Sequence, residues 1–340
     1  MYDIVAVGSA TRDALVKSEH FKVFDDARFA TKKSLALPLG SKISIKDIVF
    51  TTGGAGTNTA VTFARLGLKT ACLARVGFDV SGETVLRELK HEKVDTRFME
   101  TDHLAATAYS IVLEPAAGER TILTYRGANE GLTARELTRI PTRWIYLSSI
   151  SANLGILKSA ILAKKKFGTR IAWNPGGTDL ALGAKKLRPH LKYIDVFIAN
   201  KEEVAELVGL KYDDPKVFCA LNELVGGLAV MTMGPEGVMV SDGKKIWRAG
   251  TFKEKKMVDR TGAGDAFGSG FVSGLLLAGI YGGRSMTEKA ILEALRVGAA
   301  NATSKVEHIG AKGGLITKRE LKAARWKKLK VVASSDCFRN

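Results

Sequence analysis

The segment of this sequence best suited to chemistry is a glycine-rich turn that leads directly into an apolar helical stretch. It runs from Val258 to Phe267 with the letters VDRTGAGDAF. The N–H groups of such a turn point outward together, and the helix dipole adds partial positive charge, so an anion could bind here. Asp265 could then accept a proton from a hydroxyl, as phosphoryl transfer to an alcohol requires. From the spacing alone, a turn that only reverses the chain is an equally good interpretation.

Two better-known phosphate motifs are absent from the sequence. The pattern G-x-x-x-x-G-K-[ST] occurs nowhere, which excludes a P-loop enzyme. Gly262 and Gly264 do not continue as G-x-G-x-x-G, because Phe267 stands at the third position. The preceding residues are also too polar for the buried first strand of a dinucleotide-binding fold.

A second glycine-rich element, Gly53–Asn58 with the letters GGAGTN, also enters a helical pattern. Successive glycines allow positive φ angles and close approach of the backbone to a ligand. Asn58 could hydrogen-bond a polyol, or it could cap the helix that begins here. Asp13 lies just beyond the first predicted strand, where a carboxylate could accept hydrogen bonds from two sugar hydroxyls. An exposed loop carboxylate is the alternative for Asp13.

Two further motifs follow apolar strands and therefore lie at the carboxyl edge of the predicted sheet, where α/β proteins bind ligands. In Asn200–Glu203 (NKEE), Glu203 could hold Mg²⁺ through water, because Mg²⁺ keeps several of its waters. First-turn acids that complement the helix dipole are the alternative for this motif. Thr232–Gly237 (TMGPEG) could face a nucleotide or form only a turn.

Short apolar runs alternate with helical patterns along most of the chain, which predicts a mostly parallel sheet with helices on both faces. The predicted strands are Ile4–Val7, Thr70–Val76, Trp144–Ser148, Arg170–Trp173, Val196–Ala199 and Leu228–Met233. The predicted helices are Thr57–Leu66, Glu83–His91, Leu154–Phe167, Lys201–Val208 and Pro215–Val225.

Two stretches break this alternation and predict a small separate β-sheet, a candidate lid. The first, Glu19–Phe50, is polar and basic, and the second, Thr107–Tyr125, has strand-like runs on both sides of the turn EPAAGE. We expect one domain over residues 1–316, with lid segments near 10–50 and 99–126. The basic segment Thr317–Lys330 has helical spacing of its apolar residues, which predicts an amphipathic helix that docks Trp326. The last residues, Ala333–Asn340, are expected to be unstructured.

The composition is that of a soluble globular protein. The 340 residues include 52 Lys and Arg against 35 Asp and Glu, which gives a formal charge of +17. No apolar run is long enough to cross a membrane, the first residues lack the basic region of a signal peptide, and the three cysteines form no pair motif. We therefore expect a cytoplasmic protein. The basic residues are dispersed, which indicates solvated faces rather than a nucleic-acid or membrane surface.

Taken together and in this order, the motifs resemble the ribokinase-like (PfkB-type) carbohydrate kinase family from about Tyr2 to Gly313. The matching segments are Gly8–Asp13, Gly53–Asn58, Arg75–Glu83, Gly127–Asn129, Asn200–Glu203, Thr232–Gly237 and Asp259–Phe267. The resemblance implies a three-layer α/β fold, in which helices flank a mostly parallel central sheet and a small β-sheet lid closes over the acceptor.

The resemblance also implies roles for individual residues. Asp265 would be the catalytic base. Asn200 and Glu203 would organise Mg²⁺ and the phosphates of ATP through water. The amides that would form the anion hole for the transferred γ-phosphoryl group are those of Gly262, Ala263 and Gly264. The residues that would face the acceptor hydroxyls are Asp13, Gly53, Gly54 and Asn58, and those along the nucleotide are Thr232, Gly234, Gly237 and Asn301.

Several positions depart from the family pattern. Thr11 stands where ribokinases usually have Asn, and Ala55 stands where they have Lys, both near the sugar. The insertion Asp25–Ile48 extends the lid. Arg260 stands where the family often has Thr, which leaves open whether this chain uses a monovalent cation of the ribokinase type. The expected activity is ATP- and Mg²⁺-dependent phosphorylation of a primary hydroxyl on a sugar.

The sequence leaves three alternatives to a sugar kinase. A nucleoside kinase has the same chemistry but needs an apolar or aromatic platform, for which Phe21, Phe24, Phe29 and Tyr109 are candidates. A non-catalytic nucleotide-sensing protein of the same fold would not need Asp265. A nucleic-acid-binding protein is suggested only by the charge of +17. For the assembly, lid edges that pair between subunits would give a homodimer.

Overall fold

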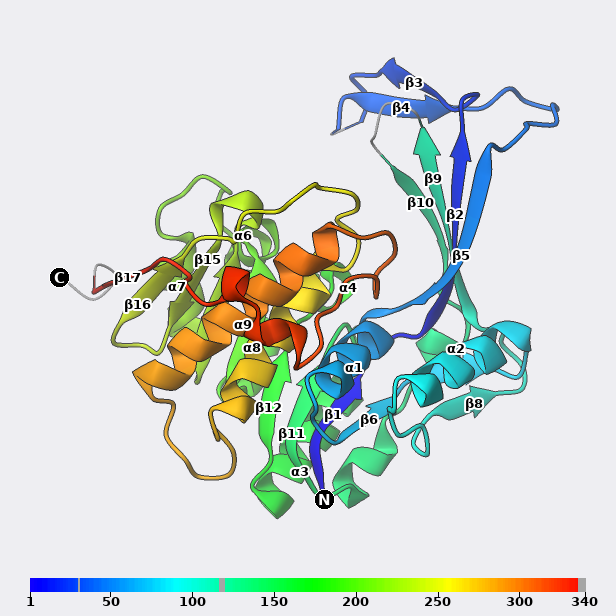
Figure 1. The fold of residues 1–340 in the computed structure, drawn as a ribbon. Coiled ribbons are helices and arrows are strands. Elements are labelled where there is room, and N and C mark those ends of the chain that lie inside the picture. Colours follow the sequence, from blue (N-terminus) through cyan, green and yellow to red (C-terminus); the bar gives the residue numbers. More distant parts are fainter. Residues whose placement is uncertain (30, 116–119, 336–340) are drawn as a thin grey trace.

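A large mixed sheet runs through the middle of the molecule (Figure 1). The structure is a computed structural model that describes residues 1–29, 31–115 and 120–335. Within these ranges the sheet has nine strands, which are, in spatial order, β17 (Val331–Ser334), β16 (Ile246–Ala249), β15 (Val238–Ser241), β14 (Leu228–Thr232), β13 (Val196–Asn200), β12 (Arg170–Trp173), β11 (Thr142–Leu147), β1 (Tyr2–Val7) and β6 (Thr70–Leu73). Neighbouring strands are parallel from β14 to β6 and antiparallel from β14 to β17.

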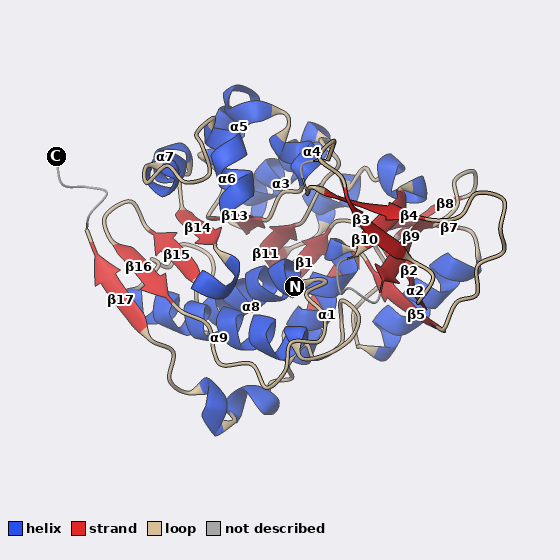
Figure 2. Ribbon diagram, turned by 90° about the horizontal axis from the view of Figure 1, so that it is seen from above, coloured by secondary structure: helices blue, strands red, loops and turns tan. Residues whose placement is uncertain are grey.

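Helices cover both faces of this sheet, so the fold has the three layers that the motifs predict (Figure 2). One layer contains α1 (Ala55–Arg65), α8 (Ala263–Leu277) and α9 (Glu288–Val306). The other contains α3 (Leu154–Phe167), α4 (Gly177–Leu180), α5 (Gly183–Leu191), α6 (Lys201–Val208) and α7 (Val217–Leu224). Alternate residues of one strand enter the two cores: Ile145 packs under α3, whereas Trp144 packs under α8. Strands that are apolar on both sides need this double cover.

A second sheet projects from one end of the body and forms the lid (Figure 1). Its strand order is β10 (Thr121–Tyr125), β9 (Ala108–Pro115), β2 (Thr11–Ser18) and β5 (Asp47–Gly53). A hairpin of β3 (Lys22–Asp25) and β4 (Lys33–Ala36) lies at its far end. The strand β8 (Glu100–Asp102) pairs with β7 (Arg75–Gly77) instead, so the second lid segment begins later than the expected residue 99.

The strand register decides which side chains face the same side of the lid. Asp13 on β2 lies opposite Thr51 on β5 and beside Ser110 on β9, so these three side chains share one face. Arg12 pairs with Thr52 and Tyr109, which therefore point to the opposite face. The face that carries Asp13 thus has hydroxyl groups around the carboxylate.

Most of the predicted elements are present, and α2 (Val80–His91) contains the predicted helix Glu83–His91. The predicted strand Thr70–Val76 is divided into β6 and β7. The two runs around EPAAGE form the antiparallel pair β9–β10, although residues 116–119 of that turn lie outside the described residues. Short 3-10 turns lie at η1 (Gly127–Gly131), η2 (Arg135–Arg139) and η3 (Gly234–Glu236). Among the described residues, no helix has both the length and the apolar character needed to cross a membrane.

The basic segment after residue 317 does not form the amphipathic helix that its spacing predicts. It contains two 3-10 turns, η4 (Glu320–Lys322) and η5 (Ala324–Trp326), separated by Ala323 in an extended conformation. An α-helix would place Leu321 and Trp326 about 140° apart, whereas the break lets both enter one cluster with Phe252. The strand β17 then pairs with β16, so the expectation of an unstructured end is wrong for Ala333 and Ser334, and residues 336–340 lie outside the described residues.

Trp326 anchors this C-terminal segment. It is 3% exposed, its ring centroid lies 5.1 Å from that of Phe252, and the Arg325 guanidinium lies 4.0 Å from the indole. We expect Trp326→Ala to lower the free energy of unfolding by about 3–5 kcal/mol, because it removes a large buried side chain. Chemical denaturation measures this loss. The exposed Lys328→Ala is the control, and a loss for Trp326→Ala no larger than that of the control would contradict docking.

Candidate active site

Two glycine-rich motifs that lie far apart in the sequence meet where α1 and α8 begin. The Asn58 Nδ2 donates a hydrogen bond of 2.9 Å to Oδ2 of Asp265, across a sequence separation of 207 residues. Asn58 is 4% exposed, and its Oδ1 has no hydrogen-bond partner among the described residues. Asn58 therefore holds the Asp265 carboxylate while keeping a buried acceptor free.

Asp265 lies in an environment that makes its carboxylate more basic. Burial raises the pKa of Asp265, and the hydrogen bond from Asn58 opposes this shift. Tyr146 on β11 is fully buried, and its hydroxyl lacks a partner within the described chain. Burial and then the negative charge of Asp265 raise the pKa of Tyr146. A carboxylate with a raised pKa is a better proton acceptor than an exposed one.

The turn before α8 is held from below by Asp259. Its Oδ1 accepts hydrogen bonds from the N–H (2.8 Å) and hydroxyl (2.7 Å) of Thr261, and its Oδ2 accepts from the N–H of Gly310 (2.9 Å). Although burial alone would raise the pKa of Asp259, these bonds and Lys305 bring it below the usual value. Gly262 has φ +74, and a Cβ there would lie 3.1 Å from Ala311, so both conformation and space favour glycine.

The predicted anion hole is at the first turn of α8, where N–H groups have no carbonyl one turn earlier in the helix. Of its three predicted amides, that of Ala263 donates to the Arg260 carbonyl at 3.1 Å. Gly264 is exposed and lines the neighbouring pocket, so its backbone faces space that a ligand can enter. The three residues predicted for the anion hole thus share one turn with Asp265, but the Ala263 amide already has a backbone partner.

The residues predicted to face the acceptor lie where the lid joins the body. A Cβ at Gly53 would lie only 2.0 Å from Oδ2 of Asp13, so only glycine lets the carboxylate pack there. The Thr11 hydroxyl donates to Oδ1 of Asp13 at 3.0 Å, and the Thr51 hydroxyl is buried without a partner in the described chain. Burial raises the pKa of Asp13, against the hydrogen bonds from Thr11 and Ser110. Gly54 is the N-cap of α1.

A pocket of about 300 Å³ lies beside the first turn of α8. The predicted nucleotide residues Thr232, Gly234 and Gly237 line it together with Ala263 and Gly264. Further side chains on its wall are Phe252, Met257, Phe267, Ala302 and Thr303. The pocket is therefore a largely apolar cleft that opens beside the anion turn, a form that suits a nucleotide base next to its phosphates.

Asn301 does not line this pocket, contrary to its predicted place beside the nucleotide. It is fully buried, its Nδ2 donates to the Ala266 carbonyl at 2.8 Å, and its Oδ1 accepts from the N–H of Ile316 at 3.0 Å. The helical period turns Asn301 toward α8, whereas the next two residues of α9 face the pocket. Its amide ties α9 to α8 and to the C-terminal segment.

Asn200 and Glu203 form a capping box at the start of α6. The N–H of Glu203 donates to Asn200 Oδ1 at 2.9 Å, and the N–H of Asn200 donates to Glu203 Oε2 at 2.8 Å. Burial and the nearby charges of Glu202, Glu206 and Asp265 raise the pKa of Glu203. The other oxygen of Glu203 would be available to a water on Mg²⁺, so the chemistry of the pair would suit a cation held through water. The described residues contain no group of three or more side chains that could bind a metal directly.

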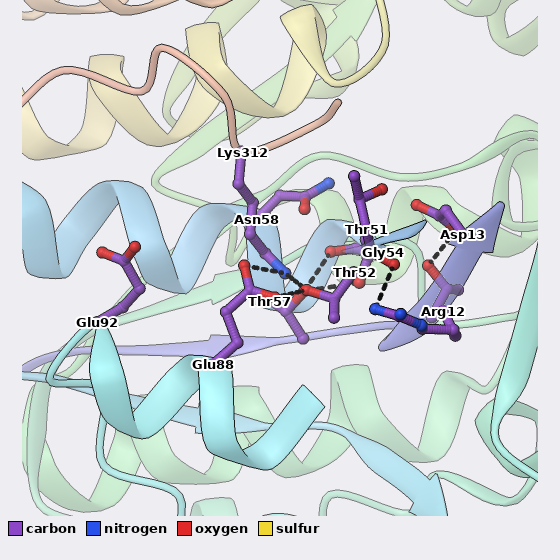
Figure 3. Close-up of polar contacts among 12 residues, drawn as sticks. Arg12, Asp13, Thr51, Thr52, Gly54, Thr57, Asn58, Glu88, Glu92 and Lys312 are labelled. Carbon is purple, nitrogen blue, oxygen red and sulfur yellow. Dashed lines mark hydrogen bonds and ion pairs between the residues drawn. The ribbon is translucent and has the colours of Figure 1, made fainter. Parts of the chain in front are cut away.

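Lys312 is a site residue that the motifs did not indicate. Its ammonium donates to the Thr52 hydroxyl at 2.5 Å and lies 3.6 Å from Oε1 of Glu88, while the Thr52 hydroxyl donates to Glu88 (Figure 3). Burial lowers the pKa of Lys312, and the carboxylates of Glu88 and Asp13 oppose this shift. The lysine thus joins the root of the lid, α2 and the loop after α9. A lone lysine in a glycine-rich loop gives no sequence signal of this contact.

The lid is attached to the body by two further carboxylates. Arg120, at the start of β10, forms an ion pair of 3.1 Å with Oδ1 of Asp259 below the anion turn. Asp79 caps α2 and accepts hydrogen bonds of 2.7 Å from both the N–H and the hydroxyl of Thr107. The lid thus contacts both the carboxylate that holds the turn before α8 and the start of α2.

Comparison with known proteins identifies the family. A family model described as pfkB family carbohydrate kinase matches residues 3–318. The chain belongs to the pfkB carbohydrate kinase family. It is therefore a phosphotransferase that uses an alcohol group as acceptor, within a family that includes sugar and nucleoside kinases.

Relatives of this pfkB chain have several substrates. A ribokinase of Haemophilus influenzae is 28% identical over 277 residues, which cover 79% of this chain and 85% of that one. A fructokinase of Escherichia coli is 28% identical over 286 residues, 80% of this chain and 91% of that one. Among solved structures, a nucleoside kinase of Methanocaldococcus jannaschii has a TM-score of 0.73 at 22% identity, with coverage of 96% and 98%. A ribokinase of Cryptococcus neoformans solved with ADP has a TM-score of 0.73 at 23% identity, with coverage of 95% and 99%.

The contacts of Lys312 predict a coupled network at the lid root of this kinase. Lys312→Met leaves Thr52 and Glu88 without their cation, so we expect the free energy of unfolding to fall by about 1–3 kcal/mol. In the double variant with Glu88→Gln, the loss should be smaller than the sum of the single losses by at least about 0.5 kcal/mol. Equilibrium denaturation of the four proteins measures this cycle. Strict additivity would show that the ammonium and Glu88 do not interact.

Proposed function

We propose that this chain is an ATP-dependent sugar kinase that transfers the γ-phosphoryl group to a primary hydroxyl. The observation that supports this most is the position of Asp265. Its carboxylate is bonded to Asn58 on the acceptor side, and it directly follows Gly264, which lines the proposed nucleotide pocket. The Asp265 carboxylate thus lies between the polar site around Asn58 and the apolar pocket beside Gly264.

The proposed reaction is an in-line displacement. The acceptor hydroxyl oxygen forms a bond to the γ-phosphorus, the bond from that phosphorus to the β,γ-bridging oxygen breaks, and ADP leaves with the electron pair. Asp265 takes the hydroxyl proton. The N–H groups at Gly262 and Gly264 and the dipole of α8 stabilise the negative charge on the transferred group.

Nucleotide and Mg²⁺ are proposed to bind at the carboxyl edge of the sheet. The nucleotide's adenine base is proposed to lie between Phe252 and the segment Thr232–Gly237, with the phosphates toward the first turn of α8. The Cryptococcus ribokinase solved with ADP supports the use of an adenine nucleotide. Mg²⁺ neutralises the phosphate charge when bound, and Asn200 with Glu203 would hold its waters.

The acceptor site favours a sugar over a nucleoside. The hydroxyls of Thr11, Thr51 and Ser110 share the face of the lid that carries Asp13, and such donors and acceptors match a polyol. The Asn58 side-chain carbonyl adds an acceptor that has no partner among the residues the structure describes.

The aromatic residues that could hold a base do not form a platform on that face. Tyr109 points to the opposite side of the lid, and Phe21 is buried. Phe24 and Phe29 are more than half exposed, and they belong to the β3–β4 hairpin region at the far end of the lid (Figure 1). A nucleoside kinase is therefore the second candidate, suggested by relatives rather than by this lid.

ADP release from ATP and Mg²⁺ across a panel of pentoses, hexoses and nucleosides tests the proposal. We expect turnover with sugars only, and Asp265→Asn should lower kcat by roughly 10²–10⁴ because no base remains. The variant should keep ATP binding and its melting temperature. Turnover near that of the wild type in Asp265→Asn would show that Asp265 is not the catalytic base. Turnover with nucleosides alone would show that the acceptor is a nucleoside rather than a sugar.

The pH dependence tests the bond from Asn58. Asp265 acts only when deprotonated, so activity falls as the pH drops through its pKa. The Asn58 amide lowers that pKa, and its removal in Asn58→Ala should raise it further. The acid limb of kcat should consequently move to higher pH, as measured with saturating substrates. Asn153→Ala, which removes the side-chain cap of α3, is the control, and its acid limb of kcat should stay where it is in the wild type. An acid limb that moves to lower pH in Asn58→Ala would contradict the hydrogen bond to Asp265.

A further inference from the structure

A second buried lysine lies directly below the anion turn. Lys305, in the last turn of α9, has a side chain that is 0% exposed. Its Nζ donates to the carbonyl oxygen of Asp259 at 2.7 Å and to that of His308 at 3.3 Å. It also lies 3.7 Å from Oδ2 of Asp259. The ammonium is therefore surrounded by two carbonyl oxygens and one carboxylate.

This set of oxygens is the kind that binds a compact cation. Carbonyl and carboxylate oxygens are the ligands of hard metal ions, and an ammonium group in the same place donates hydrogen bonds to them. A buried positive charge is tolerated only when such partners compensate for the lost water. Because all three contacts are taken by Lys305, the site does not fit an additional monovalent ion.

The position of the ammonium connects it to the phosphate site. Asp259, its partner, also binds Thr261 in the anion turn and Gly310 in the loop after α9. Arg120 adds a second positive charge at 3.1 Å from Asp259. Lys305 thus links the segment before Gly262, at Asp259, to the loop after α9, at His308. Its ammonium also adds positive charge close to the turn that is proposed to bind the γ-phosphate.

We propose that Lys305 is a positioning residue whose ammonium replaces an exchangeable monovalent cation under the anion turn. This proposal depends on one part of the proposed function, namely that the turn before α8 binds a phosphate of the nucleotide. Its consequence is that the kinase needs no K⁺, Na⁺ or NH₄⁺, whereas an enzyme without this ammonium would gain from one of them.

The first arm of the test uses the wild-type chain. The rate of ADP release with the acceptor found in the panel, and the Kd of ADP from calorimetry, are measured in tetramethylammonium chloride and in KCl, NaCl or NH₄Cl at equal ionic strength. We expect both values to change by less than about twofold, since the charge is already present. Saturable stimulation by K⁺ well beyond that would overturn the proposal.

The second arm removes the ammonium. Lys305→Ala should lower kcat by roughly 10- to 100-fold by misplacing the turn, and K⁺, NH₄⁺ or methylammonium should restore it with saturation. Lys312→Ala is the matched control, because it also removes a buried lysine. The Lys312 ammonium contacts Thr52 and not Asp259. Restoration of Lys305→Ala no greater than that of Lys312→Ala would overturn the proposal.

Two measurements keep the test decisive. If Lys305→Ala does not fold, Lys305→Gln retains a neutral donor, and K⁺ should raise its melting temperature more than that of the wild type. An equal rise would contradict the proposal. If no acceptor is phosphorylated, the proposed function fails, while the ADP affinities of the wild type and variants in each salt still test the role of Lys305.

Discussion

The hydrogen bond between Asn58 and Asp265 is the constraint on which the site depends. It joins the first turns of α1 and α8, two helices of the same layer that both begin at glycine-rich turns. Burial raises the pKa of the Asp265 carboxylate, whereas the bond orients the carboxylate and lowers that pKa. A reaction between two bound substrates needs such a shared point, since misplacement of a reacting group by a fraction of a bond length costs rate.

The loop after α9 carries this constraint to the rest of the molecule. Gly310 contacts Asp259 below the anion turn, Ala311 lies against Gly262, and Lys312 reaches the root of the lid. Lys305, five residues before Gly310, completes the contact with Asp259. Two buried ammonium groups therefore lie at opposite ends of one short segment, one in contact with Asp259 and the other with Thr52.

The strand pairing of the lid gathers polar side chains from separate segments on one face. Alternation along β2, β5 and β9 gives one polar face with Asp13, Thr51 and Ser110, and the register of three strands brings these residues together. The opposite face carries exposed apolar side chains such as Phe50 and Leu123. The two faces of this small sheet therefore differ, because one is polar and the other carries exposed apolar side chains.

The sequence by itself determined the layers and the local motifs of this protein. Apolar runs alternating with helical patterns are a local property, so the parallel sheet, α3, α6 and the β9–β10 pair could be predicted from spacing. The glycines before Asp265 and Asn58 likewise indicated an anion site and a polar site.

The tertiary structure decided what such spacing cannot express. Asn301 turns to α8, and Leu321 with Trp326 breaks a helical pattern to enter one cluster. Lys305 and Lys312 acquire their roles only from partners distant in the chain. The physical reason is that the cost of burying a charge or an amide depends on the atoms brought around it, and folding alone supplies those atoms.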